Sequence, residues 1–89
     1  MYEVLIVLYV DPANTDDQLS REFKVPFLPP LKSILFLSET STLATVEEII
    51  TTLNTGIPTS YEIRANVDRN SFTQQERTIL IEDEGWKVN

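Results

Sequence analysis

The chain has no cysteine and no histidine among its 89 residues. Without these side chains, it cannot build a Ser-His-Asp or Cys-His catalytic arrangement, or a zinc site with the usual nitrogen and sulfur ligands. Glycine is also scarce, at positions 56 and 85 only, so none of the known glycine-rich phosphate-binding loops can form. The sequence therefore predicts a protein that is not an enzyme, with no catalytic residues, no cofactor and no metal site.

Positive charge is in short supply as well. Lys and Arg together number 7 against 14 Asp and Glu, and the net charge is −7. The basic residues are spread from Arg21 to Lys87 without a cluster. Because nucleic-acid binders gain much of their affinity by neutralising phosphates, we expect no direct binding to DNA or RNA. The acidic excess fits either a solubilising surface or an acidic surface offered to a basic partner.

The chain also lacks a long hydrophobic run. The apolar N-terminal segment ends at Asp11, at about half the length that a membrane span needs. It carries Glu3 and has no basic residues before it, unlike a secretory signal. The lack of cysteine favours a reducing compartment or a core that is stable without disulfides. We therefore expect one small domain over residues 1–89, soluble and cytoplasmic, without membrane contact.

Two segments have the alternation of β-strands. Residues 2–10 present two faces that are both apolar, apart from Glu3, and such a strand normally lies at the centre of a sheet. Residues 61–67 alternate apolar side chains with polar ones such as Glu62 and Arg64. This second strand should therefore place one face in the core and the other in water.

Residues 11–18 come directly after the first strand, and they are rich in Asp, Asn and Pro. This composition favours a turn with side-chain hydrogen bonds to the local backbone. Three carboxylates in the segment are compatible with calcium binding, but the glycine and glutamate of an EF-hand loop are not in register. The segment is expected to be a solvated loop.

The stretch 21–37 contains two apolar segments separated by three prolines. Pro26 cannot donate a ladder hydrogen bond, so the first segment should be a half-buried strand at an edge of the sheet. The next two prolines form a rigid corner. Residues 34–37, apolar on both faces, are expected beside residues 2–10. We name as the candidate partner edge the three apolar residues of the first segment, Phe23, Val25 and Phe27.

Residues 42–53 leave two interpretations open. Four apolar residues match the spacing of one helical face, namely Val46, Ile49, Ile50 and Leu53. Several residues of the segment are β-branched, however, and this weakens a helix and favours a strand. A strand with a bulge at Glu47 and Glu48 would form a hairpin with residues 61–67.

The C-terminal segment fits a helix that begins at Ser71, because Ser71 and Gln74 have the spacing of a capping box. Gly85 stands where a residue of left-handed conformation would end that helix. Residues 78–81 could instead form a strand. Trp86 is expected to fold back and anchor the C-terminus. The acidic run before it, which we name the candidate acidic patch, consists of Glu82, Asp83 and Glu84.

These patterns predict an α+β fold that is mainly antiparallel β, either a small five-stranded curled sheet or an SH3-like barrel, with a C-terminal helix. If residues 42–53 are helical, the alternative is a four-stranded sheet with two helices on one face. The expected function is that of a small protein-interaction or structural module that binds a protein partner or self-associates. The alternative is an acidic inhibitor or nucleic-acid mimic, of the kind found among small viral proteins, that binds a basic partner protein.

Overall fold

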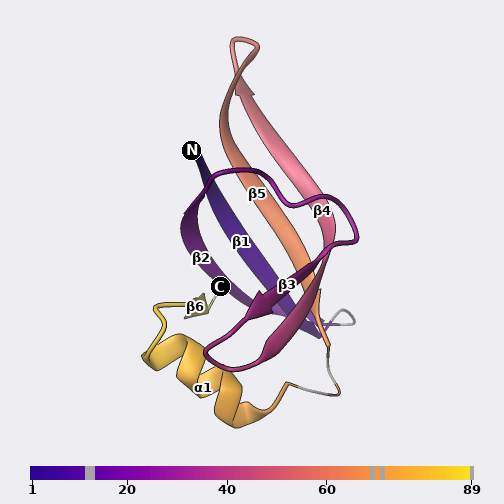
Figure 1. Cartoon of the computed structure of the whole chain (residues 1–89), viewed down its shortest axis with the longest axis vertical. Helices are drawn as coiled ribbons and strands as arrows, with labels where there is room; N and C mark the ends of the chain where they lie inside the picture. The colour runs from indigo at the N-terminus through magenta and orange to yellow at the C-terminus, as the bar shows by residue number, and fades with distance from the viewer. Residues whose placement is uncertain (12–13, 69, 71, 89) are drawn as a thin grey trace.

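The computed structural model describes residues 1–11, 14–68, 70 and 72–88. These residues form one curled sheet and one short helix (Figure 1). In chain order, the elements are β1 (Tyr2–Asp11), β2 (Asn14–Val25), β3 (Ile34–Leu37), β4 (Thr42–Asn54), β5 (Ile57–Val67), α1 (Gln74–Glu82) and β6 (Lys87–Val88).

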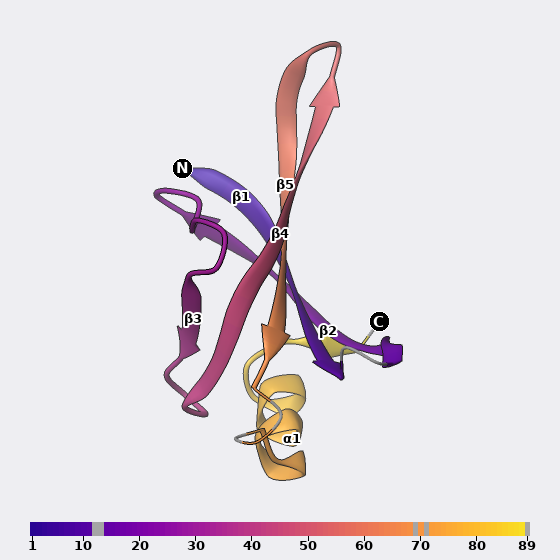
Figure 2. The ribbon, with the colours of Figure 1, turned by 90° about the vertical axis from the view of Figure 1, so that its right-hand side faces the viewer.

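The strands of the described chain lie side by side in the order β3-β4-β5-β1-β2-β6. β1 and β5 run parallel, and all the other neighbours run antiparallel. The prediction of a mainly antiparallel α+β fold is therefore confirmed. The sheet has six strands instead of five and is curled into a half-barrel (Figure 2). The four-stranded alternative with two helices is wrong, because residues 42–54 form the strand β4.

The core lies on one face of the four central strands. Val46 and Leu8 flank Ala65 from opposite sides, and Leu19 lies opposite Leu8 on β2. All four side chains are fully buried, so this row forms the floor of the core. The predicted central position of residues 2–10 is confirmed, because β1 is paired on both sides. The other buried hydrophobic residues of this cluster are Val4, Ile6, Ala44, Ile63, Val67, Leu80 and Trp86.

The helix α1 lies at one end of the sheet, and the β4–β5 hairpin projects from the opposite end (Figures 1 and 2). Thr73 caps the helix, because its side chain accepts a hydrogen bond from the backbone N–H of Glu76 at 3.1 Å. The capping pair is therefore two residues later than predicted, and Ser71 lies outside the described residues. The alternative strand at 78–81 is wrong, because these residues are helical.

The end of α1 matches the prediction from the sequence. Gly85 has a φ of 76°, in the left-handed region that a residue with a side chain rarely adopts. This conformation returns the chain to the core, and the backbone N–H of Trp86 donates to the carbonyl of Leu80 at 3.0 Å. Trp86 is buried, so its predicted role as an anchor is confirmed. Farther back in the helix, Arg77 ties α1 to β2 through an ion pair with Asp17 at 3.0 Å.

β4 shows that β-branched composition outweighed helical spacing. The pairing with β5 shifts between Val46 and Glu48, which is the bulge that the sequence predicted at this point. The bulge keeps Val46 and Ile49 on the core side, opposite Ala65 and Ile63. A turn at Thr55 and Gly56 then joins β4 to β5 in the predicted hairpin.

Two predictions about the first half of the chain were wrong. Residues 11–18 were expected to be a loop, but Asp11 belongs to β1 and residues 14–18 belong to β2, where pairing between the two strands satisfies the backbone hydrogen bonds; residues 12 and 13 lie outside the described residues. β3, expected beside residues 2–10, pairs instead with β4 at the far edge of the sheet. It could not lie beside β1, because both sides of β1 are taken by β2 and β5.

Candidate functional site

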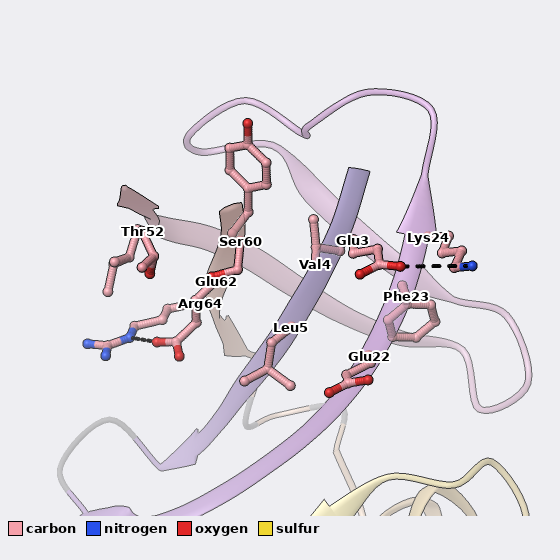
Figure 3. A pocket seen from close by; sticks show the side chains of 12 residues that line it. Glu3, Val4, Leu5, Glu22, Phe23, Lys24, Thr52, Ser60, Glu62 and Arg64 are labelled. Atoms are coloured by element: carbon pink, nitrogen blue, oxygen red, sulfur yellow. Dashed lines mark hydrogen bonds and ion pairs between the residues drawn. The ribbon is translucent and has the colours of Figure 1, made fainter. Parts of the chain in front are cut away.

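The sheet face opposite the core contains an open hollow of about 640 Å³ (Figure 3). It lies over β4, β5, β1 and β2, with Leu5 between the charged side chains of the strands on either side of β1. Leu5 is directly opposite Glu22 on one side and Glu62 on the other. The residues that line the hollow are Glu3, Val4, Leu5, Glu22, Phe23, Lys24, Ile50, Thr52, Ser60, Tyr61, Glu62 and Arg64.

Both cationic side chains that line this hollow, Lys24 and Arg64, form ion pairs. Arg64 Nε donates to Glu62 Oε2 at 2.6 Å, and Arg64 Nη1 lies 3.9 Å from Glu48 Oε1. Lys24 Nζ lies 3.9 Å from Glu3 Oε1. The hydrogen bond that Arg64 donates to Glu62 raises the pKa of Arg64 further above its usual value, so this guanidinium stays charged. Each cation of the hollow therefore faces a carboxylate of the same chain.

Glu22 has no ion pair among the residues that the structure describes. Of the three carboxylates that line the hollow, Glu3 and Glu62 are paired with cations, and the exposed Glu22 beside Leu5 can attract a cation. Within the described ranges, no group of three or more acidic side chains is placed to hold a metal ion.

The outer edge of β3 is open. In an antiparallel ladder, residues that bond to the neighbouring strand alternate with residues whose N–H and C=O point away from it. The Ser33 carbonyl accepts from the Val46 N–H at 2.9 Å, so Leu35 also bonds to β4, while Ile34 and Phe36 point their backbone groups outward. No strand of the described chain pairs with this edge.

The other side of the β3–β4 ladder supports this assignment. Phe36 lies opposite Leu43 in the register. The Leu43 carbonyl accepts from the Asp68 N–H at 3.0 Å, on the side of β4 that faces away from β3. Since Leu43 directs its backbone toward that side, it does not bond to Phe36, and the backbone groups of Phe36 are left at the open edge.

The outward face of the same two strands is apolar and exposed. Ile34 and Phe36 are 62% and 56% exposed, and Leu43 is 39% exposed. Their neighbours Leu35 and Leu37 point to the other face and pack against the core. We name Ile34, Phe36 and Leu43, together with the outward backbone groups of β3, the β3 edge surface.

The structure separates the residues of the candidate partner edge. Phe23 and Val25 pack against the core, and the Phe23 ring contacts the Trp86 ring with centroids 5.7 Å apart. Phe27 lies beyond the end of β2 and is 70% exposed. The outer side of β2 pairs with β6 only at Leu19 and Ser20. The three residues therefore do not form one exposed surface.

The candidate acidic patch lies at the C-terminal end of α1. Glu82 is the last residue of the helix, Asp83 is its C-cap, and both are exposed, whereas Glu84 is half-buried. In the part of the chain that the structure describes, no helix is both long and apolar enough to cross a membrane.

Comparison of the chain with protein-family models, with curated proteins and with solved structures gave no match. Sequence reasoning did not single out the β3 edge surface as a site. Residues 34–37 gave only part of the signal: a strand that is apolar on both faces leaves one apolar face exposed unless both faces of the sheet are covered there, but its composition does not show that it lies at an edge.

Proposed function

We propose that the protein is a non-catalytic interaction module, and that its β3 edge surface binds an extended segment of another polypeptide as an added strand. The observation that carries this proposal is the outward direction of the backbone groups of Ile34 and Phe36 beside their exposed apolar side chains. In strand addition, main-chain hydrogen bonds supply affinity, and alternate side chains supply specificity.

The composition of β3 supports this role. Soluble proteins usually protect an exposed edge strand with charged residues, proline or a covering segment. Residues 34–37 contain no charge and no proline. Covering Ile34 and Phe36 would contribute up to about 1.5–3 kcal/mol for each side chain that becomes fully buried. An added strand therefore gains both backbone and side-chain interactions at this edge.

A random peptide library displayed on phage, selected against the wild-type protein, tests the proposal. Phe36→Pro should abolish binding of the selected peptides, because proline removes an outward N–H without removing a bond to β4. The matched control is Leu53→Lys, which changes an exposed apolar residue on the distant β4–β5 hairpin and should leave binding unchanged.

The expected result is a set of β-prone peptides that slow the amide exchange of Ile34 and Phe36. Circular dichroism of Phe36→Pro establishes that the fold is retained. Peptides that bind wild type and Phe36→Pro equally well, or a selection that yields no binders, would reject strand addition at this edge.

A second function, an acidic inhibitor or nucleic-acid mimic that captures a basic partner, is favoured by the net charge of −7 and by Glu22, which has no ion pair within the described residues. Binding of poly-L-lysine at low and high salt distinguishes this function. If the protein is an acidic inhibitor or mimic, its binding of poly-L-lysine should be lost as the salt concentration rises. The same binding should be weaker in Glu22→Gln than in wild type. Strand addition at β3 should change little with salt.

A further inference from the structure

We propose that the strand added to β3 is β3 of a second copy of this chain, in an antiparallel pairing about a two-fold axis. This inference rests on the proposed function and names its partner. In the proposed register, Ile34 of one copy lies opposite Phe36 of the other, and the two copies of Leu35 face each other at the axis.

Symmetry and backbone direction select this register. A two-fold axis that makes neighbouring strands antiparallel is perpendicular to the sheet, so the core face of both copies lies on the same side. Residues that lie opposite each other must then share a face, as Ile34 and Phe36 do. Both residues direct their N–H and C=O outward, so each opposed pair exchanges two hydrogen bonds.

The side chains match on both faces of the joined sheet. On the outward face, Ile34 of one copy packs beside Phe36 of the other, which is a favourable pair of β-branched and aromatic side chains. On the core side, Leu35 meets its own copy, and both are half-buried in the single chain. No charged side chain of residues 34–37 enters the contact.

The charges that flank β3 favour the antiparallel direction. Lys32 precedes the strand and pairs with Glu47, and its side chain is 72% exposed. Glu39 follows the strand, is exposed, and has no ion pair in the described part of the chain. Antiparallel pairing brings Lys32 of each copy toward Glu39 of the other, whereas parallel pairing would bring like charges together.

The size of the contact predicts a weak association. A strand of four residues and three partly exposed apolar side chains bury less than the roughly 1,000 Å² that marks stable complexes. We therefore expect a weak dimer that exchanges with monomer in solution. A covalent trap is the appropriate measurement for such a complex.

The trap uses the absence of native cysteine, which makes every disulfide an intermolecular one. In the proposed register, the two Leu35 Cα atoms lie about 4.5 Å apart, within the range that a disulfide spans. Leu35→Cys should therefore form a disulfide dimer under mild oxidation. The matched control is Leu37→Cys, on the same face and also half-buried, whose Cα atoms would be about 13 Å apart.

We expect Leu35→Cys to cross-link at least about ten times faster than Leu37→Cys at equal concentration, because a disulfide needs close Cα atoms. Equal rates for the two variants would overturn the register, and no dimer from Leu35→Cys would overturn self-pairing. If peptides selected on the β3 edge surface bind while Leu35→Cys stays monomeric, the module function stands and only the identity of the partner fails.

Charge reversal supplies a second test that needs no change within β3. Sedimentation equilibrium should show that Glu39→Lys and Lys32→Glu each weaken self-association several-fold, since each variant places two like-charged pairs at the interface. An equimolar mixture of the two variants should restore the wild-type level, because both cross-copy pairs are then of opposite sign. A mixture that associates no better than either variant alone would overturn the antiparallel arrangement.

Discussion

Trp86 closes the core between α1 and β2 although it lies outside every long element. It is 3% exposed, and its ring lies against Phe23. Trp86→Ala should lower the free energy of unfolding by about 3–5 kcal/mol, the usual cost of deleting a large buried aromatic side chain. Urea denaturation followed by circular dichroism measures this, and Trp86→Phe should lose clearly less. A loss below about 1 kcal/mol for Trp86→Ala would mean that the C-terminal segment is peripheral.

Thr55 occupies a turn position that suits asparagine better than threonine. Thr55 and Gly56 have φ values of 52° and 81°, as a two-residue type I′ hairpin turn requires. A β-branched residue is strained there, whereas asparagine tolerates the left-handed region. Thr55→Asn should therefore stabilise the hairpin by about 1 kcal/mol.

Urea denaturation and amide exchange near the hairpin tip measure the effect of Thr55→Asn. The control is Thr51→Asn, an exposed threonine within β4, which should be neutral or destabilising because asparagine disfavours strands. If both variants destabilise to a similar extent, strain at Thr55 does not limit the hairpin.

Sequence reasoning succeeded at residues whose chemistry is specific and failed where tertiary pairing imposes the conformation. Gly85 was placed correctly, because glycine is the usual residue in a left-handed helix end. Lys32 and Ser41 also have positive φ values, of 67° and 56°. Neither residue type signals this conformation. It follows instead from the backbone contacts between β3 and β4, because Lys32 lies just before β3 and Ser41 lies in the turn that follows it.

At the scale of elements, α1 carries an unfavourable distribution of charge. Its last turn has no basic residue, and Glu82, Asp83 and Glu84 gather at the negative end of the helix dipole. Asp83→Lys should raise the free energy of unfolding by about 0.3–1 kcal/mol, and added salt should reduce this gain. Thermal unfolding at low and high salt checks both expectations.

The same change of charge at the opposite end of α1 controls for a general effect of net charge. Glu76 lies in the first turn, where the dipole favours an acidic residue, and its Oε2 accepts from the Thr42 hydroxyl at 3.4 Å. Glu76→Lys makes the same charge change as Asp83→Lys but should destabilise the protein. Equal stabilisation by both variants would attribute the effect to the net charge of −7 and not to the helix dipole.

The individual strands were easier to predict than their neighbours. The composition of residues 42–53 favoured a strand and also indicated its bulge, because the apolar residues on either side of Glu47 change phase. The position of β3 in the sheet could not be predicted from residues 34–37, since a short apolar strand can pair with any neighbouring strand of suitable length. The β3 edge surface was missed for the same reason, because it exists only if β3 lies at the edge.

At the scale of the whole molecule, the parallel pairing of β1 with β5 joins the first third of the described chain to its last third. It aligns Val4 with Tyr61, whereas β4 and β5 are joined by a tight turn. The alternation of apolar and polar residues along a strand shows which face is buried, but it does not show which distant strand lies beside it. The β1–β2 and β4–β5 hairpins therefore depend on residues that are close in the sequence, and the parallel pairing of β1 with β5 joins the two hairpins into one sheet.

This topology predicts the order in which core contacts form during folding. Val46 and Leu8 are both fully buried and flank Ala65, one across the local β4–β5 hairpin and the other across the long-range β1–β5 pair. Because closing a long loop costs more entropy than closing a tight turn, we expect the hairpin contact to form first. In stopped-flow measurements, Val46→Ala should mainly slow folding, and Leu8→Ala should mainly speed unfolding. The reverse pattern would show that β1 and β5 meet before the hairpin is complete.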